Sequence, residues 1–244
     1  MTELAIIGGT GLTQIPGFDI VSSEWVETLY GRPSSRIVTG FLGKSKYIFI
    51  ARHGDPHTIP PHKINYRANI QALKILGVRS VISIAAVGGI DERAVPGKLM
   101  IPDQIIDYTY GREHTFFDGE TGNLDHIDFT EPYSNTLRQK LIRVAQKAGV
   151  ETINSGVYGC TQGPRLETAA EIGKLEKDGC SIVGMTGMPE ASLAKEAGLD
   201  YACCSVVANW AAGKAGTTEI TMEEIKENLS HGMSDLHEIL RHWE

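Results

Sequence analysis

The chain has 244 residues, of which 41% are hydrophobic and 22% are charged. This composition is typical of a soluble globular protein and excludes intrinsic disorder as the main state. Lys and Arg number 23 against 30 Asp and Glu, and the formal net charge of -7 argues against nucleic acid as a partner, since that needs a large basic surface. A small anionic ligand is compatible with this charge, because its binding depends on local hydrogen-bond donors.

The cysteines and the N-terminus indicate where the protein works. The four cysteines, at positions 160, 180, 203 and 204, are too few and too irregularly spaced for a disulfide framework, so we expect reduced, mostly buried thiols. The first residues lack the basic start and apolar run of a signal peptide, and no stretch approaches the ~20 apolar residues of a membrane span. A cytoplasmic protein without membrane contact is the expectation.

The first half of the chain predicts strands interrupted by one helix. An apolar run at 4–9 ends in a glycine-rich turn, as a buried first strand does. Residues 36–39 and 46–51 predict two strands around a turn at Gly43. A helix is expected over 65–76, ended by Gly77. Residues 81–87 predict a strand buried on both faces, and 98–106 a further strand.

The second half continues the alternation after a long loop. Residues 107–131 are aromatic and aperiodic, which is typical of a functional or interfacial loop. A helix from Ser134 to Gly149 is followed by strand, helix, strand, helix and strand at 152–158, 167–177, 181–185, 189–197 and 201–208. Thr221 and Glu224 have capping-box spacing at the start of a long last helix. The pattern predicts one α/β domain over residues 1–244, with a central mixed, mostly parallel sheet flanked by helices.

Chemically interesting residues follow the ends of several predicted strands. Ligands of open α/β sheets bind beyond the carboxyl ends of the strands, so these residues are expected in one pocket. A glycine turn with a hydroxyl at Thr10, a guanidinium at Arg52, an imidazole at His53 and a hydroxyl at Thr186 would suit a phosphate ion. Each residue taken alone has a structural explanation, such as a turn at Thr10 or a helix N-cap at Thr186.

Other kinds of site fit the sequence less well. The glycine turn lacks the third glycine of a dinucleotide-binding motif, and no P-loop motif is present. His53, Asp55, His57 and His62 are close in sequence, but the intervening prolines prevent a helix that would align them on a metal, so no metal site is expected. Neither a nucleophile elbow nor an activated cysteine is recognisable.

Six ordered motifs together carry a family resemblance. They are Gly9-Thr10-Gly11-Leu12, Arg52-His53-Gly54, Asn65-Tyr66-Arg67-Ala68-Asn69, Gly88-Gly89, Gly163-Pro164-Arg165-Leu166-Glu167-Thr168 and Gly184-Met185-Thr186-Gly187-Met188-Pro189-Glu190. From about Leu4 into the last helix, the chain resembles the trimeric purine nucleoside phosphorylase and methylthioadenosine phosphorylase family. The resemblance implies the nucleoside phosphorylase fold, a homotrimer, and attack of inorganic phosphate on C1' of a purine nucleoside. Phosphate is then a co-substrate, and no cofactor is implied.

The resemblance also assigns residues. It implies phosphate binding by Thr10, Arg52, His53, Ala86 and Thr186 and a ribose contact by Met185. It implies a base pocket at Glu167 and Asn209, a 5' pocket near Met222, and His126 entering from a neighbouring subunit. Ala85 departs from the family, whose members usually carry Asn, Thr or Ser there, and this removes one polar contact on the phosphate and ribose side.

Four side chains bear on the choice of nucleoside. A carboxylate at Glu167 suits the N1-H of a 6-oxopurine, and an amide at Asn209 replaces the Asp usual in methylthioadenosine phosphorylases. Ile220 and Met222 are apolar, which suits a 5'-methylthio group, although both would equally serve to pack the last helix on the sheet. With these residues together, the chain most resembles the family members that act on S-methyl-5'-thioinosine, and this nucleoside is the substrate that the resemblance implies. The alternatives are a methylthioadenosine or general purine nucleoside phosphorylase and a catalytically silent nucleoside-binding protein.

Overall fold

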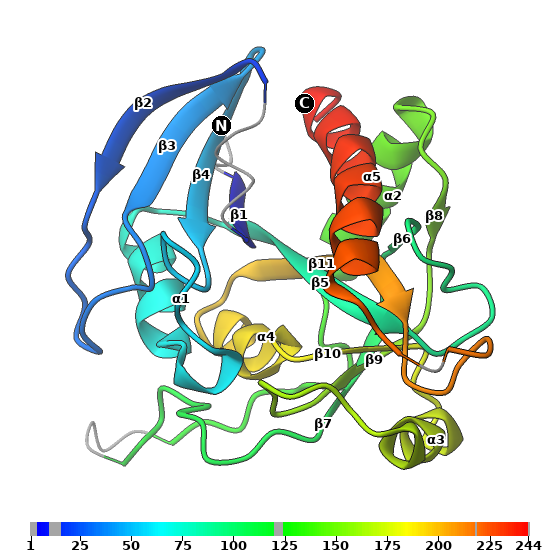
Figure 1. The fold of residues 1–244 in the computed structure, drawn as a ribbon. Helices are drawn as coiled ribbons and strands as arrows, with labels where there is room; N and C mark the ends of the chain where they lie inside the picture. The colour runs from blue at the N-terminus through cyan, green and yellow to red at the C-terminus, as the bar shows by residue number, and fades with distance from the viewer. Residues whose placement is uncertain (1–3, 10–15, 120–123, 218, 244) are drawn as a thin grey trace.

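The fold is built on one extended, strongly curved sheet. A computed structural model describes residues 4–9, 16–119, 124–217 and 219–243, and within them an eleven-stranded sheet (Figure 1). The strands are β1 (Leu4–Gly8), β2 (Phe18–Glu24), β3 (Ile37–Leu42), β4 (Ser45–Ala51), β5 (Ser80–Gly89), β6 (Leu99–Met100), β7 (Gln104–Asp107), β8 (Thr152–Ile153), β9 (Val157–Cys160), β10 (Ile182–Gly184) and β11 (Asp200–Trp210).

Parallel pairing at the centre of the sheet creates the edge on which a site can form. β1 pairs in parallel with β4 and β5, and β5 pairs in parallel with β11 along its whole length. The carboxyl ends of these four strands therefore meet at one edge. β10 enters beside the end of β5 in the antiparallel direction, with Val183 opposite Gly88. The sheet is thus mixed and mostly parallel, as predicted.

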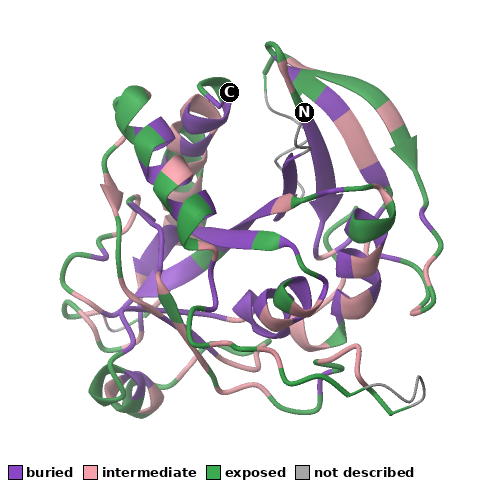
Figure 2. Ribbon diagram, turned by 180° about the vertical axis from the view of Figure 1, so that it is seen from behind, coloured by how far each residue is buried: buried purple, intermediate pink, exposed green. Residues whose placement is uncertain are grey.

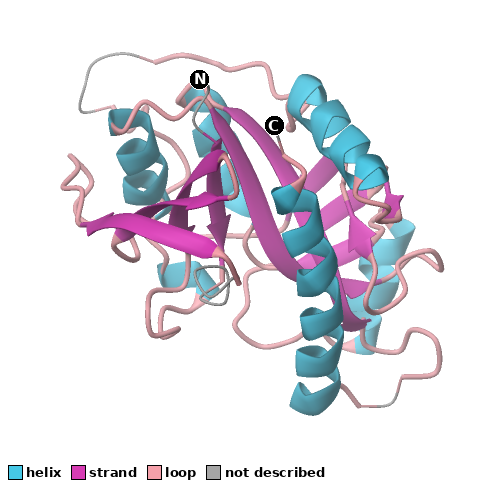
Figure 3. Cartoon of the chain, turned by 90° about the horizontal axis from the view of Figure 1, so that it is seen from above, coloured by secondary structure: helices cyan, strands magenta, loops and turns pink. Residues whose placement is uncertain are grey.

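Helices cover both faces of the sheet (Figure 3). They are α1 (Tyr66–Ile75), α2 (Asn135–Lys147), α3 (Ala169–Lys177), α4 (Gly187–Glu196) and α5 (Met222–Arg241). Side-chain caps at Asn65, Ser134, Thr168 and Thr221 satisfy N-H groups at the starts of four of them. Buried residues of α1 and α4 belong to one large hydrophobic cluster, and those of α2 and α5 to a second. Figure 2 shows the buried central strands between these helices.

Several expected elements need correction. The strand predicted at 98–106 is two strands, β6 and β7, because the chain leaves β11 after Met100 and pairs next with β9. The strand predicted at 152–158 is likewise divided, since β8 pairs with β6 whereas β9 pairs with β7 and β10. β2 was not predicted, because it is an edge strand whose residues are mostly exposed. β11 extends to Trp210, beyond the expected end at Ala208.

Two further expectations concern the cysteines and the membrane. All four cysteines are free thiols and buried, as predicted. In the described ranges, none of the helices combines the length and apolar character needed to cross a lipid bilayer.

Candidate active site

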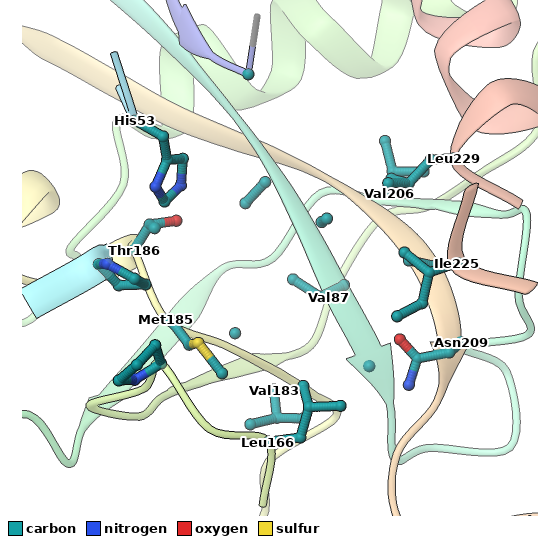
Figure 4. Close-up of a pocket in the computed structure, with 18 of the residues that line it drawn as sticks. His53, Val87, Leu166, Val183, Met185, Thr186, Val206, Asn209, Ile225 and Leu229 are labelled. Atoms are coloured by element: carbon teal, nitrogen blue, oxygen red, sulfur yellow. The ribbon is translucent and has the colours of Figure 1, made fainter. Parts of the chain in front are cut away.

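A pocket of about 730 Å³ opens at the carboxyl ends of the central strands. Eight of the ten residues predicted for the site line it, namely Arg52, His53, Ala86, Glu167, Met185, Thr186, Asn209 and Met222. In Figure 4, His53 and Thr186 lie on one side of the view and Asn209 on the other, with Met185 between them. Thr10 lies outside the described residues, although its neighbour Gly9 lines the pocket. His126 is exposed and does not line this pocket.

Arg52 is fixed at the base of the pocket by a buried carboxylate. Its Nε donates to Oε2 of Glu190 at 2.6 Å and its Nη2 to Oε1 at 2.8 Å. Nη2 also donates to Ser83 Oγ at 2.6 Å, and Nη1 donates to the carbonyl oxygen of Ile84 at 3.0 Å. The second N-H of Nη1 has no partner among the described residues and remains for a ligand. Arg52 is only 1% exposed, so its guanidinium is a rigid donor.

Glu190 compensates the charge of Arg52. Burial by itself would lower the pKa of Arg52, but the charge and hydrogen bonds of Glu190 outweigh burial and raise it. Glu190 is 0% exposed and also accepts a hydrogen bond from the Tyr201 hydroxyl at 2.9 Å. The pair therefore presents a directed N-H with little net positive charge.

His53 is a neutral imidazole with a defined tautomer. Its Nδ1 lies 2.9 Å from the carbonyl oxygen of Ile59, which can only accept, so Nδ1 carries the proton. Burial and the charge of Arg52 lower the pKa of His53 to about 4. Its ring stacks on His57, with centroids 4.3 Å apart. Nε2 is therefore an acceptor near neutral pH. In the described ranges, no group of three or more His, Cys, Asp or Glu side chains is arranged to hold a metal ion.

Thr186 occupies the N-cap position of α4 without capping it. Its side chain makes no capping hydrogen bond, so the structural explanation considered above does not account for the hydroxyl. The backbone N-H of Thr186 donates to the Tyr158 hydroxyl at 3.4 Å. Non-helical backbone at Met188 separates Thr186 from the regular turns of α4, so at this end of the pocket Thr186 offers its hydroxyl and not a helix dipole.

Glu167 stands just before α3 and is held by a neighbouring threonine. The Thr161 hydroxyl donates to Oε1 of Glu167 at 2.6 Å, and the backbone N-H of Thr161 donates to the Gly184 carbonyl at 2.8 Å. One carboxylate oxygen is thereby oriented, and the other remains for a ligand. Thr161 links the loop of Glu167 to the strand that precedes Met185.

Asn209 reaches the pocket through an irregularity in β11. The register between β11 and β5 shifts between Val207 and Asn209, and a bulge of this kind redirects the following side chain. The Nδ2 of Asn209 donates to the carbonyl oxygen of Trp210 at 2.7 Å. One N-H of the amide is therefore committed and one is free for a base. If Asn209 donated two hydrogen bonds to a purine, one to N7 and one to O6, its hydrogen bond to the Trp210 carbonyl would have to break.

The pocket has an apolar wall, which we call the α5 wall. It consists of Ile220, Met222, Ile225, Leu229 and Met233. Its helical members recur every three or four residues and so lie along one face of α5. The helix approaches the sheet closely, since a Cβ on Gly232 would lie 2.3 Å from Cγ1 of Val206. Figure 4 shows Ile225 and Leu229 beside Val206.

Two buried polar residues at this site were not assigned a role from the sequence. Glu190 is the last residue of the sixth motif, but nothing in the pattern indicates that it pairs with Arg52. Arg112 lies in the aperiodic loop after β7 and is 7% exposed. A charged residue that must be buried leaves no periodic signal in a loop, so sequence patterns do not reveal it.

Comparisons with known proteins agree with this geometry. The family model described as "Phosphorylase superfamily" matches residues 3–243. A relative from Xylella fastidiosa, named probable S-methyl-5'-thioinosine phosphorylase, is 53% identical over 97% of this chain and 96% of its own. A 6-oxopurine nucleoside phosphorylase from Pyrococcus furiosus is 44% identical over 97% of this chain and 89% of its own.

Solved structures extend the likeness to three dimensions. Methylthioadenosine phosphorylase from Schistosoma mansoni in complex with adenine superposes with a TM-score of 0.92 at 32% identity, covering 99% of this chain and 90% of that one. The match over nearly the whole length and the pocket at the strand ends lead to the same assignment. The chain belongs to the phosphorylase superfamily.

Proposed function

We propose that the protein catalyses the phosphorolysis of S-methyl-5'-thioinosine to hypoxanthine and 5-methylthioribose 1-phosphate. The observation that carries this proposal is one pocket that combines Arg52 and Thr186 with Glu167, Asn209 and the α5 wall. The names of four relatives, each near 50% identical and almost fully aligned, support the same substrate.

The phosphate end of the pocket supplies positioning more than charge. We expect the anion to be surrounded by an N-H of Arg52, the hydroxyl of Thr186 and the backbone around Ala86, with Thr10 as a further ligand. A phosphate oxygen attacks C1' as the bond from C1' to N9 breaks, and the electron pair of that bond passes to the purine. The departing base then takes a proton from solvent. Phosphate is the co-substrate, and this chemistry calls for no other cofactor.

The base end stabilises the charge that accumulates on the purine. The free oxygen of Glu167 accepts the N1-H of hypoxanthine, and the free N-H of Asn209 donates to O6 or N7. Both hydrogen bonds strengthen as the base becomes anionic, which lowers the barrier to bond cleavage. Adenine presents an N1 lone pair to Glu167, and leaving such buried polar groups unpaired costs ~1–3 kcal/mol each.

The sugar binds between the phosphate end and the base end of the pocket, against the α5 wall. Met185 lies between the two ends and contacts the ribose, while Met222 and its neighbours on α5 pack against the 5'-methylthio group. Burying a sulfur and a methyl in this wall gives about 1–2 kcal/mol, at ~0.8 kcal/mol for each methylene-sized group. A 5'-hydroxyl would find no polar partner on the α5 wall.

We infer a cytoplasmic homotrimer in which the exposed His126 of one subunit enters the pocket of the next. Light scattering measures the subunit number. Loss of activity in His126→Ala with an unchanged trimer would support the role across the subunit boundary, whereas full activity would remove that role.

A base-release assay with three nucleosides tests the proposed function. Methylthioinosine, methylthioadenosine and inosine are each incubated with and without phosphate, and free base is separated and quantified. We expect phosphate-dependent release with the highest kcat/KM for methylthioinosine. Faster release of adenine from methylthioadenosine would replace the substrate assignment. Binding of nucleosides without any release would favour a catalytically silent nucleoside-binding protein.

A further inference from the structure

Arg112 reaches from the long loop after β7 to the backs of two loops that line the pocket. Its Nη2 donates to the carbonyl oxygens of Thr161 and Gln162, at 3.2 and 2.8 Å. Its Nη1 donates to the carbonyl oxygens of Met185 and Met188, at 2.9 and 2.5 Å. The guanidinium itself is buried and does not line the pocket.

Carbonyl dipoles and neutral groups, not a carboxylate, surround this cation. In the part of the chain that the structure describes, no ion pair is formed by Arg112. Its remaining hydrogen bonds go to the side chains of Gln162 and Tyr66, both at 3.2 Å. Burying a charge without a counterion is unfavourable unless many hydrogen bonds replace its hydration. The arginine therefore uses its full set of planar donors on these loops.

The two loops carry opposite ends of the pocket. Residues 161–167 lead to Glu167, and the side chain of Thr161 orients that carboxylate. Residues 185–188 contain Met185 and Thr186, at the phosphate end. The loops touch at Gly163, where a Cβ would lie 2.5 Å from Sδ of Met185 and where φ is +62°. Arg112 ties the same two loops together from the side away from the pocket.

We propose that Arg112 is a positioning residue that fixes the purine-binding loop relative to the phosphate-binding loop, so that base and nucleophile are held at the spacing the reaction requires. The proposal rests on the proposed function, because it assigns purine and phosphate to the two ends of the pocket. Small displacements of bound groups reduce rates steeply, so a tie between the two loops acts on both ligands at once.

Lysine is the informative substitution at this position. Arg112→Lys keeps the positive charge, but a single ammonium group lacks the fork that spans four carbonyl oxygens on two loops. If only the charge of Arg112 matters, the lysine variant should behave like the wild type. If the hydrogen bonds to both loops matter, it should not.

Arg138 provides a matched control. It is also 7% exposed, and like Arg112 it is held mainly by backbone carbonyl oxygens, those of Pro102, Ile101 and Asn154. Neither Arg138 nor its three partners lines the pocket. Arg138→Lys therefore removes an equivalent buried arginine without touching either loop.

The test uses calorimetric titration of the full chain with inorganic phosphate and, separately, with hypoxanthine. We expect Arg112→Lys to weaken both affinities by about tenfold and to lower kcat further, as expected when two aligned groups are displaced. Arg138→Lys should lower the melting temperature to a similar extent and leave both affinities and kcat within twofold. The dissociation constants are the readout that a purely structural arginine would not move.

The outcomes separate this inference from the proposed function. If the wild-type protein binds both ligands and Arg112→Lys binds both equally well, or weakens only one, the positioning role is overturned while the function stands. If the wild-type protein binds neither ligand, both proposals fail. Should Arg112→Lys not fold, Gln162→Leu removes the acceptor of Nε on the purine-binding loop, and unchanged affinities for both ligands in that variant would overturn the role.

Discussion

The guanidinium of Arg52 and the carboxylate of Glu190 form a two-point ion pair beneath the pocket, with hydrogen bonds of 2.6 and 2.8 Å. Both side chains are almost completely buried. The pair holds Arg52 in one orientation and cancels most of its charge. Phosphate is thus expected to meet a directed donor at the base of the pocket.

Removing one member of this pair should destabilise the fold. Glu190→Gln leaves Arg52 as a buried charge without a counterion, and such a change typically costs about 3–5 kcal/mol. Urea denaturation in phosphate-free buffer measures the free energy of unfolding. Glu151→Gln is the control, because Glu151 pairs with Lys98 while 89% exposed and exposed pairs contribute about 0–1 kcal/mol. A loss below about 1 kcal/mol in Glu190→Gln would contradict the interpretation.

The amide of Asn209 should decide between purines. Asn209→Asp replaces the free N-H by an acceptor, which suits the 6-amino group of adenine and repels O6 of hypoxanthine. We expect the ratio of kcat/KM for methylthioadenosine over methylthioinosine to rise about a hundredfold, from two mismatches of ~1–3 kcal/mol each. Asn135→Asp makes the same change of charge on the exposed start of α2 and should leave the ratio unchanged. An unaltered ratio in Asn209→Asp would remove Asn209 from base recognition.

His53 should make stability depend on pH in a defined range. Its pKa is about 4 in the folded protein against 6.5 for an unperturbed histidine, so between these values the unfolded chain binds a proton that the native chain does not. The stability contributed by neutral His53 is therefore complete above about pH 6.5 and is lost as pH falls toward 4. Urea denaturation at pH 7 and pH 5 should show a larger loss for the wild type than for His53→Gln. Equal losses would show that the imidazole is not held neutral.

The α5 wall should select the 5' substituent. Ile225→Gln places an amide where the methylthio group is expected, while glutamine keeps a good helix propensity. We expect the KM for methylthioinosine to rise about tenfold, the equivalent of ~1–2 kcal/mol of lost apolar contact, and the KM for inosine to change by less than threefold. Lys226→Gln, on the exposed side of the same turn, should change neither value. Parallel increases for both nucleosides would indicate a general distortion of α5.

Much of the site could be predicted from the sequence, because the topology of a parallel sheet determines which residues lie together. Apolar runs mark β1, β4 and β5, and parallel pairing brings their ends together, so Arg52, His53 and Ala86 could be placed in one pocket from the pattern of strands. Thr186 follows the end of a further predicted strand, and the family motifs added Glu167, which stands just before α3. In these cases a local sequence pattern predicts the strand or helix, and the geometry of a parallel sheet then places its end at the pocket.

Other features depend on contacts that no local pattern encodes. The shift of register in β11 that redirects Asn209 becomes visible only once β5 is known as its neighbour. Glu190 has the sequence character of a first-turn helix residue, yet it is buried against an arginine 138 positions away. Arg112 lies in a loop without periodicity. β2 lacks an apolar face, because it is an edge strand.

The order of these parts along the chain has a consequence for how such a protein can diversify. Every described residue assigned to base or phosphate precedes Gly213, whereas the α5 wall begins at Ile220 and belongs to the terminal segment. That segment docks on the β3–β4 hairpin, through hydrogen bonds from Ser45 and Tyr47 to the carbonyl oxygens of Trp243 and Leu240. Replacement of this terminal segment alone would therefore keep the residues assigned to base and phosphate and would change the specificity for the 5' substituent of the sugar.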